Sequence, residues 1–253
     1  MREKINFMIN LKATICYDGS RYTGWQIQKN SNHTIQQKIE EVLTEVLGEK
    51  IEIIASGRTD AGVHAMGQVI NFRTNSEIPL PELRDKINFA LPSDISFKKL
   101  KKESDRFHAR YNVASKIYMF RILNSDTPNP FLRKYTYFYP HEINISAMEE
   151  AAKYFVGTHD FQAFTNAKKT KKSTVRTIHS IEIKKFNNEV QVFVRGDGFL
   201  HNMVRIIVGT LFEVSEGKRN AQDIEKLFSS GKRSESGYMV PPHGLFLYEV
   251  FYK

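Results

Sequence analysis

Alternation of apolar and polar residues predicts a half-buried strand over residues 10–17, near the start of the chain. The apolar positions recur at every second residue and would share one face of the strand: Ile9, Leu11, Ala13, Ile15 and Tyr17. The glycine- and aromatic-rich stretch YDGSRYTGWQIQ follows and is typical of a loop.

The period then changes to that of a helix. Thr34 and Gln37 have the spacing of a capping box, and Gly48 is suited to end the helix. The apolar stripe between them consists of Ile35, Ile39, Val42, Leu43, Val46 and Leu47. Strands are expected at 49–55, 67–73 and 95–100, with a second helix around Leu83–Leu91 after two prolines.

The second half loosely repeats this order of elements. Strands are expected at 116–123, 135–139, 175–185, 190–195 and 245–252, with a hairpin at Asn187-Asn188. Helices are expected after a capping box at Ser146, over the apolar run 203–214, and after a cap at Asn220.

The order strand, helix, strand, strand, helix, strand is typical of an α+β fold. We therefore predict two similar α/β-sandwich halves, each a mainly antiparallel sheet with helices on one face. Residues 1–110 would form the first half and residues 111–253 the second, with the boundary near Arg110.

Composition and charge narrow the range of partners. The chain has 253 residues, of which 41% are hydrophobic, enough for a buried core. Thirty-seven Lys and Arg against 28 Asp and Glu leave a formal charge of +9, which favours a polyanion such as RNA. The single cysteine, Cys16, excludes an internal disulfide framework. With no apolar run of membrane-spanning length and no export signal, we expect no membrane partner and a cytoplasmic location.

Specialised chemistry is concentrated in ASGRTDAGVHAMGQVINF, residues 55–72. Asp60 in this strand-to-strand turn is consistent with simple capping of backbone N–H groups. It is also consistent with a carboxylate presented in the open, since Gly57 and Gly62 allow another chain to approach closely. Arg58 would lie on the same side as Asp60 in an extended segment, close to the carboxylate or to a phosphate. The pattern alone leaves both interpretations open.

Several motifs resemble those of the tRNA pseudouridine synthase A family, in the family's order and over the whole chain. They are GRTDAGVHAMGQV, YTGWQIQ, RFHARY, SKIYMFRI, STVRTI, GDGFLHNMVRIIVGTL and PPHGLFL. The resemblance implies isomerisation of uridine to pseudouridine in the anticodon stem-loop of tRNA, with Asp60 as the nucleophile. It also implies that the reaction needs no cofactor and no metal, and that two subunits form a homodimer around the RNA.

The resemblance assigns further residues to the site. Arg205, inside the apolar stretch of HNMVRIIVG, would hold the Asp60 carboxylate ionised; its structural alternative is an arginine that reaches the helix surface. An Arg–Asp pair at about 4 Å with an effective dielectric constant of about 20 is worth roughly 4 kcal/mol, enough to outweigh moderate desolvation. Tyr118 would stack on the uracil, unless it is a plain core tyrosine, and Leu245 would wall the uracil pocket, unless it is an ordinary strand leucine.

The remaining expected contacts are with RNA. The resemblance implies that Arg58 enters the RNA stack when the target base leaves it. The polar segment KKTKKSTVR offers phosphate contacts from Lys168, Lys169, Lys171, Lys172 and Arg176, and Arg21 would contribute from the early loop. The second lysine run, FKKLKK, favours a solvated loop. His64, His108 and His201 lack a second ligand at metal spacing, so we expect no metal site.

Three alternative functions fit parts of the pattern. A paralogue could isomerise a ribosomal RNA uridine, and the departures SNHTIQQKI and GYMVPPHGL from the family pattern could alter RNA selection. A non-catalytic RNA-binding module would not need Asp60, Tyr118 and Arg205 together. A retaining glycosidase would need a second carboxylate about 5 Å from the first, and none of the motifs contains one.

Overall fold

The alternating residues 10–17 form strand β1 (Ile9–Tyr17), at the centre of the first of two structural units. The computed structural model describes residues 8–167 and 173–253. Contacts divide the chain into a first unit, Met1–Ala114 together with Glu249–Lys253, and a second unit, Ser115–Tyr248. The sequence analysis placed the boundary near Arg110 and the whole chain end in the second half. The structure groups the last five residues with the first unit.

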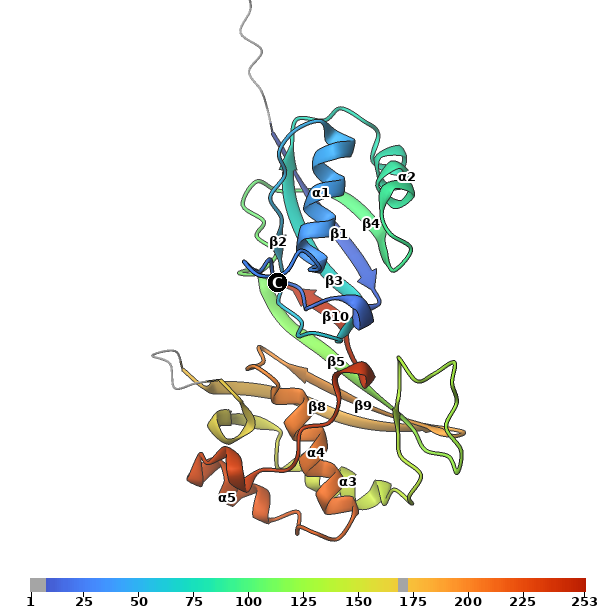
Figure 1. Ribbon diagram of the computed structural model, residues 1–253. Coiled ribbons are helices and arrows are strands. Elements are labelled where there is room, and N and C mark those ends of the chain that lie inside the picture. Colours follow the sequence, from blue (N-terminus) through green and yellow to red (C-terminus); the bar gives the residue numbers. More distant parts are fainter. Residues whose placement is uncertain (1–7, 168–172) are drawn as a thin grey trace, which may run out of the picture. The chain divides into compact units, whose positions relative to one another are not determined.

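In the first unit, β1 pairs antiparallel with β3 (His64–Thr74) and with β4 (Ile95–Glu103), while β2 (Ile54–Ala55) pairs with the other edge of β3. The inward-facing residues Leu11, Ala13 and Ile15 are fully buried. Helices α1 (Ile35–Leu47) and α2 (Leu80–Ala90) complete the unit and pack against each other, and α2 contacts β4 (Figure 1).

The ends of α1 follow the sequence closely. The Thr34 side chain accepts a hydrogen bond from the Gln37 backbone N–H at 3.3 Å, and Gly48 ends the helix in the left-handed conformation with φ of 68°. The reciprocal half of the predicted capping box does not form, because the Gln37 side chain donates to Glu41 at 2.8 Å instead. Thr34 therefore caps the helix alone.

The predicted strand at 49–55 is reduced to β2. The backbone N–H of Ile51 donates to the Thr44 hydroxyl at 3.2 Å, and that of Ile53 donates to Glu40 Oε1 at 3.0 Å. Since side chains of α1 satisfy these N–H groups, the segment packs under the helix and needs no neighbouring strand.

Strand β5 (Val113–Leu123) belongs to the second unit from Ser115 onward. It is the first strand of this unit's sheet, whose order is β5-β9-β8-β7. Its other strands are β6 (Tyr137–Phe138), which pairs parallel with β5, β7 (Gly157–Asp160), β8 (Val175–Phe186) and β9 (Glu189–Gly196). The hairpin between β8 and β9 turns at Asn187, which has φ of 51°, as predicted. Strand β10 (Leu245–Tyr252) begins in this unit and ends in the first.

Three helices belong to the second unit: α3 (Ile145–Lys153), α4 (Met203–Ser215) and α5 (Asp223–Ser230). Helix α4 is buried nearly throughout and packs against α3, which contacts β8 (Figure 1). Apart from the additional elements β6, β7 and α5, the order β5, α3, β8, β9, α4, β10 repeats the strand–helix–strand–strand–helix–strand order of the first unit. The α+β class and the mainly antiparallel pairing are thus confirmed.

Two predicted caps and one predicted loop are wrong. Asn144, not Ser146, caps α3 by accepting from the Ala147 N–H at 3.0 Å. Asn220 lies outside α5, whose N-cap residue Gln222 makes no side-chain cap. The FKKLKK run forms part of β4 and is not a loop, because its residues pair with β1. Within the described residues, no helix is long and apolar enough to cross a bilayer.

The single cap of α1 gives a first prediction. Thr34→Ala should lower the free energy of unfolding by about 1 kcal/mol, since an N-terminal N–H loses its acceptor. Gln37→Ala, the matched control, should cost only a few tenths of a kcal/mol, because an exposed side-chain pair on a helix is worth that little. Urea denaturation measures both; equal losses would mean that Gln37 also caps the helix.

Candidate active site

Asp60 lies in the irregular segment 56–63 between β2 and β3, and its side chain is half-buried. The Val63 N–H donates to the Asp60 carbonyl oxygen at 3.1 Å, which closes a tight turn. Gly62 occupies that turn with φ of 76°, a conformation that other residues rarely adopt. The backbone conformation of this turn therefore requires a glycine at position 62, two residues after Asp60.

Side-chain hydrogen bonds fix the segment that carries Asp60. Gln68 accepts from the Ser56 hydroxyl at 2.6 Å and donates to the Gly57 carbonyl oxygen at 3.0 Å. The hydroxyl groups of Thr59 and Tyr17 lie 2.8 Å apart in a hydrogen bond, and burial raises the pKa of Tyr17. Because these groups are buried and mutually bonded, the backbone on both sides of Asp60 is held in place.

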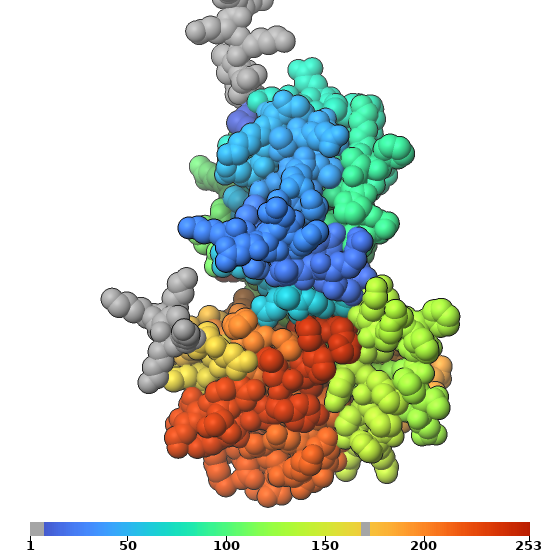
Figure 2. Space-filling model, viewed as in Figure 1, coloured from blue at the N-terminus to red at the C-terminus, as the bar shows by residue number. Residues whose placement is uncertain are grey.

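A second loop, residues 18–28, packs directly against this segment. The Trp25 N–H donates to the Thr59 carbonyl oxygen at 3.0 Å. A Cβ atom at Gly19 would lie 2.1 Å from the carbonyl oxygen of Val63, and one at Gly24 would lie 3.1 Å from that of Thr59. In the space-filling view this blue segment forms part of the surface of the first unit (Figure 2). The sequence analysis predicted close approach at Gly57 and Gly62 and missed Gly19 and Gly24, although both stand in the YDGSRYTGW stretch.

Two predicted RNA contacts also belong to the first unit. Arg58 is exposed, whereas Asp60 is half-buried. Arg21 donates from Nε and Nη2 to Asp94 Oδ2 at 2.9 and 2.6 Å, and the Tyr22 hydroxyl donates to Asp94 Oδ1 at 2.7 Å. These bonds give Arg21 a structural role in anchoring the loop 18–28, while its contact with RNA stays a prediction.

Arg205 is buried in the first turn of α4, with 8% of its surface exposed. Its Nε donates to the Val240 carbonyl oxygen at 2.7 Å, and its Nη1 donates to Asn202 Oδ1 at 2.9 Å. Asn202 adopts the left-handed conformation with φ of 62°, an uncommon backbone state that turns the chain into the helix. A cation in a helix's first turn opposes the helix dipole, so stability alone does not explain Arg205.

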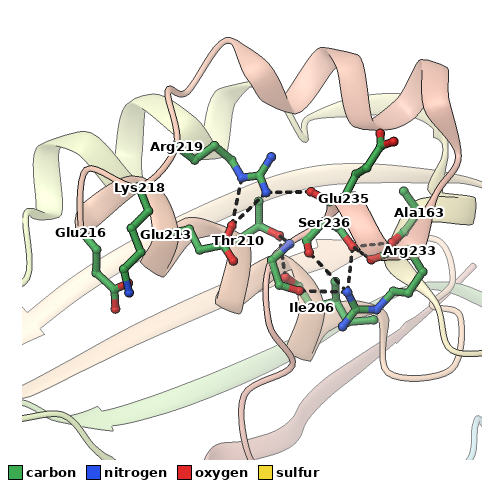
Figure 3. A network of polar contacts seen from close by, with 11 residues as sticks. Ala163, Ile206, Thr210, Glu213, Glu216, Lys218, Arg219, Arg233, Glu235 and Ser236 are labelled. Carbon is green, nitrogen blue, oxygen red and sulfur yellow. Dashed lines mark hydrogen bonds and ion pairs between the residues drawn. The ribbon is translucent and has the colours of Figure 1, made fainter.

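The chain that supplies the Val240 carbonyl is fastened along α4 (Figure 3). The Gly237 N–H donates to the Thr210 hydroxyl at 3.1 Å, and the Ser236 hydroxyl donates to the Ala163 carbonyl oxygen at 2.7 Å. A Cβ at Gly209 would lie 1.7 Å from the Tyr238 carbonyl oxygen, so only glycine allows this approach. The contacts of Arg219 with Glu213 and with the Glu235 carbonyl oxygen complete the attachment.

Tyr118 and Leu245 are buried, at 8% and 5% exposure. Tyr118 stands opposite Val194 in the β5–β9 ladder and meets the ring of Phe199 edge-on, with ring centroids 5.0 Å apart. Gly244, before Leu245, packs on Phe120, since a Cβ there would lie 2.9 Å from that ring. Phe199 is a neighbour that the sequence analysis did not single out, although it stands in the GDGFLHNMVR motif.

His243 is another residue that the sequence analysis missed. It belongs to the PPHGLFL motif, directly before Gly244, and is half-buried. Burial lowers the pKa of His243, and the nearby positive charge of Arg205 lowers it further, against a backbone hydrogen bond with Thr136 that raises it. The imidazole is therefore kept neutral at physiological pH.

Of the remaining predicted RNA contacts, Arg176 lies within the described residues and the four lysines do not. Arg176 lies in β8, half-buried, and donates to the backbone carbonyl oxygens of Ser173 and Val175 at 3.0 and 2.6 Å. The predicted phosphate contacts Lys168, Lys169, Lys171 and Lys172 lie outside the described residues. In the part of the chain that the structure describes, no three His, Cys, Asp or Glu residues are placed to hold a metal ion.

The predicted site residues that the structure describes thus fall into two sets. Arg21, Arg58 and Asp60 belong to the first unit, and the second unit holds Tyr118, Arg176, Arg205 and Leu245. Each set is built on a fixed backbone within its own unit.

Several known proteins are similar to this chain in sequence over nearly its whole length. A family model described as tRNA pseudouridine synthase matches residues 13–112 and 151–253. A protein of Bacillus cereus named tRNA pseudouridine synthase A 2 is 46% identical over 96% of this chain and 99% of its own length. Proteins of Clostridium perfringens and Acetivibrio thermocellus, named tRNA pseudouridine synthase A 2 and tRNA pseudouridine synthase A, are 46% and 45% identical, each over 97% of this chain and 100% of their own length.

Among solved structures, an archaeal box H/ACA sRNP Nop10-Cbf5 complex matches 81% of this chain and 43% of that chain with 12% identity and a TM-score of 0.33. That likeness is too distant to bear on function. The sequence relatives define the class: these are isomerases that act on RNA bases. The chain belongs to the tRNA pseudouridine synthase family.

The neutral state of His243 gives a pH prediction. Its pKa in the folded protein lies below the ordinary value of about 6.5, so at lower pH the unfolded chain binds a proton that the folded chain resists. Stability should be fully present above about pH 6.5 and fall as the pH drops toward the folded pKa. Thermal unfolding from pH 7.5 to 5 should show a smaller loss for His243→Gln than for the unaltered protein. Parallel losses would mean that His243 titrates normally.

Proposed function

We propose that the protein isomerises uridine to pseudouridine in the anticodon stem-loop of tRNA, with the Asp60 carboxylate as nucleophile. The observation that carries the proposal is the setting of Asp60. It is a half-buried acid in the family's motif, on a segment fixed by the Thr59–Tyr17 and Gln68–Gly57 hydrogen bonds. A fixed backbone allows a nucleophile to be aimed before the substrate arrives.

The chemistry rearranges bonds without gaining or losing atoms. The Asp60 carboxylate attacks the uridine, either at C1′ of the ribose or at the ring, and the bond between N1 and C1′ breaks. The uracil turns, and C5 bonds to C1′ as the carboxylate leaves. The proton on C5 is lost and N1 gains one, so the overall change is an isomerisation.

Arg205 is proposed to keep the Asp60 carboxylate ionised when the RNA excludes water from the site. Desolvation raises the pKa of a carboxyl group, and a neighbouring guanidinium opposes that rise. Two observations support this role: Arg205 is buried with its orientation fixed by Val240 and Asn202, and its position in the first turn of α4 is unfavourable for the helix itself.

The target base must leave the RNA stack to meet these groups. Unstacking a nucleotide costs a few kcal/mol, and stacking on one aromatic side chain returns roughly 1–3 kcal/mol. Tyr118 would provide that stacking and Leu245 would wall the pocket. Arg58 would fill the place that the base leaves, and the exposure of its side chain supports this role.

The same proposal covers the wider context of the enzyme. Phosphate contacts from Lys168, Lys169, Lys171, Lys172 and Arg176 would supply sequence-independent affinity. We further propose a homodimer around the RNA and a cytoplasmic location, where tRNA is available. A ribosomal RNA target is the competing assignment.

Asp60→Asn tests the nucleophile. The amide has a similar size but does not attack, so pseudouridine formation should fall by several orders of magnitude while the protein stays folded and still binds tRNA. Asp85→Asn, the same change at an exposed position on α2, should leave turnover intact. Turnover by Asp60→Asn would disprove the assignment. Mapping pseudouridine in total RNA, with and without the gene, separates a loss in the anticodon arm from one in ribosomal RNA.

A double-mutant cycle tests the proposed pair. If Arg205 and Asp60 interact, Arg205→Ala should destabilise the protein by several kcal/mol alone but by at least about 1 kcal/mol less when Asp60 is already Asn. The control cycle combines Arg205→Ala with Asp94→Asn, whose partner is Arg21. Chemical denaturation of the four proteins in each cycle gives the coupling; additive losses in the Asp60 cycle would exclude the pair.

A further inference from the structure

The sheet of the first unit has one face covered by helices and a second face that carries lysines. Leu11, Ala13 and Ile15 point to the covered face, so Lys12 and Thr14 of β1 point to the other. On the neighbouring strand β4, Lys101 stands directly opposite Lys12, and Lys99 stands opposite Thr14. Residues Lys12, Lys99 and Lys101 therefore lie on one face, here called the basic sheet face.

Lys12 is held in a defined position on this face. Its Nζ lies 4.5 Å from the ring centroid of Phe107 and 3.8 Å from that of Tyr252, which is cation–π geometry. Burial and the charge of Lys101 lower the pKa of Lys12, and Glu103 opposes them. Like charges opposite each other on paired strands destabilise a sheet, and the ion pair of Lys101 with Glu103 at 3.0 Å on the same strand offsets part of that repulsion. Lys12 and Lys99 are therefore the charges of this face best placed to meet an anion.

The loop 104–112 extends this face and is anchored to it. Asn10 Nδ2 donates to the carbonyl oxygens of Ser104 and Phe107 at 2.8 and 3.0 Å. The Ala109 N–H donates to Asn71 Oδ1 at 2.8 Å, and the Tyr252 hydroxyl donates to the Ala109 carbonyl oxygen at 2.8 Å. With both asparagines buried, the loop has one fixed conformation on the sheet.

The loop presents an aromatic ring to solvent. Tyr111 is 78% exposed, and its ring stacks on His108 with centroids 4.1 Å apart and an interplanar angle of 25°. His108 Nδ1 accepts from the backbone N–H groups of Arg110 and Tyr111, both at 3.2 Å, which fixes the imidazole beneath the phenol. Arg106 and Arg110 are exposed on the same loop. One ring face is thus covered, and a flat ligand can stack on the other.

This surface is too far from Asp60 to touch the target nucleotide. Lys12 is five residues from Tyr17 along β1, and the Tyr17 hydroxyl binds Thr59, the neighbour of Asp60. At 3.3 Å per strand residue, Lys12 and Tyr17 lie about 16 Å apart along the strand. A ligand that spans both places must be a polymer.

The helix-covered side of the same unit offers a contrast. Phe89 on α2 is 94% exposed, more than Tyr111, but its surroundings carry no excess of positive charge, because Glu82 pairs with Lys86 and Asp85 with Arg84. The groove beside it is lined by Glu82 and Asp85 together with Lys86, and α1 adds the exposed Glu41 and Glu45. A polyanion is disfavoured there and favoured on the basic sheet face.

We propose that the basic sheet face and the loop 104–112 bind the substrate RNA several nucleotides away from the target uridine. Tyr111 stacks on an unpaired base, and Lys12, Lys99 and Arg106 contact phosphates. Base–aromatic stacking and phosphate contacts together are the usual means of holding a flexible strand. The proposal rests on the proposed function, since it names a second contact region for the same RNA.

Tyr111→Ala should raise both the Kd and the KM for a full-length tRNA transcript about tenfold, the effect of losing one stacked base, while kcat changes less than twofold. Tyr111→Trp should keep wild-type affinity, because stacking needs only an aromatic ring. Phe89→Ala, which removes an even more exposed ring, should change neither constant. Affinity is measured by fluorescence anisotropy of labelled transcript, and turnover by the release of tritium from transcript labelled at uridine C5.

A second pair of variants tests the charges. Lys99→Gln with Arg106→Gln should reduce the slope of log Kd against log salt by about 2, roughly one per lost phosphate contact. Lys38→Gln with Lys86→Gln, the same charge change on α1 and α2, should leave the slope unaltered.

Four results would overturn the proposal: no change for Tyr111→Ala, equal changes for Tyr111→Ala and Phe89→Ala, an unchanged salt slope, or an altered oligomeric mass of Tyr111→Ala, which would identify a subunit interface. Failure of the proposed function looks different. The unaltered protein would then bind the transcript without converting any uridine, and the Kd values would still decide the role of Tyr111.

Discussion

The guanidinium of Arg205 sets the strongest constraint on the second unit. A buried cation must have hydrogen-bond acceptors, and the first turn of a helix offers N–H groups instead. The Val240 carbonyl and the Asn202 side chain meet this need from outside the helix. Each of these two acceptors requires a particular backbone arrangement. Asn202 must adopt a left-handed backbone, and Val240 must be brought alongside α4 by a chain that passes over Gly209 and binds Thr210.

In the first unit, hydrogen bonds between neutral groups hold the backbone around Asp60 in place. Asp60 needs a backbone that does not move, yet it stands in a turn without strand pairing. Buried hydroxyl and amide groups replace the ladder: Tyr17 holds Thr59, and Gln68 bridges Ser56 and Gly57. The loop 18–28 adds backbone contact where Gly19 and Gly24 lack side chains. In both units, polar bonds between segments distant in sequence determine where Asp60 and Arg205, the groups with a proposed catalytic role, lie.

The structural features predicted correctly from the sequence are mainly those that neighbouring residues determine. The periodicities of β1 and α4, the Thr34 cap, the Gly48 stop and the Asn187 turn all depend on neighbouring residues, and all were predicted from them. Predictions failed where distant groups decide. The segment 49–55 looked like a strand, but Thr44 and Glu40 of α1 take its N–H groups. One failure was local: Asn144, two residues before Ser146, caps the start of α3 in its place. The roles of Asp60, Tyr118 and Arg205 came from motif resemblance, since no periodicity distinguishes a reactive side chain from a buried one.

The membership of Glu249–Lys253 in the first unit has a consequence for biosynthesis. The Tyr252 hydroxyl binds the Ala109 carbonyl, and its ring covers Lys12, although about 140 residues or more separate Tyr252 from these partners in the order of translation. The ribosome therefore releases most of the first unit long before its last strand exists. Until translation reaches residue 252, the nascent chain carries an unfinished sheet, a stage at which chaperone protection is most useful.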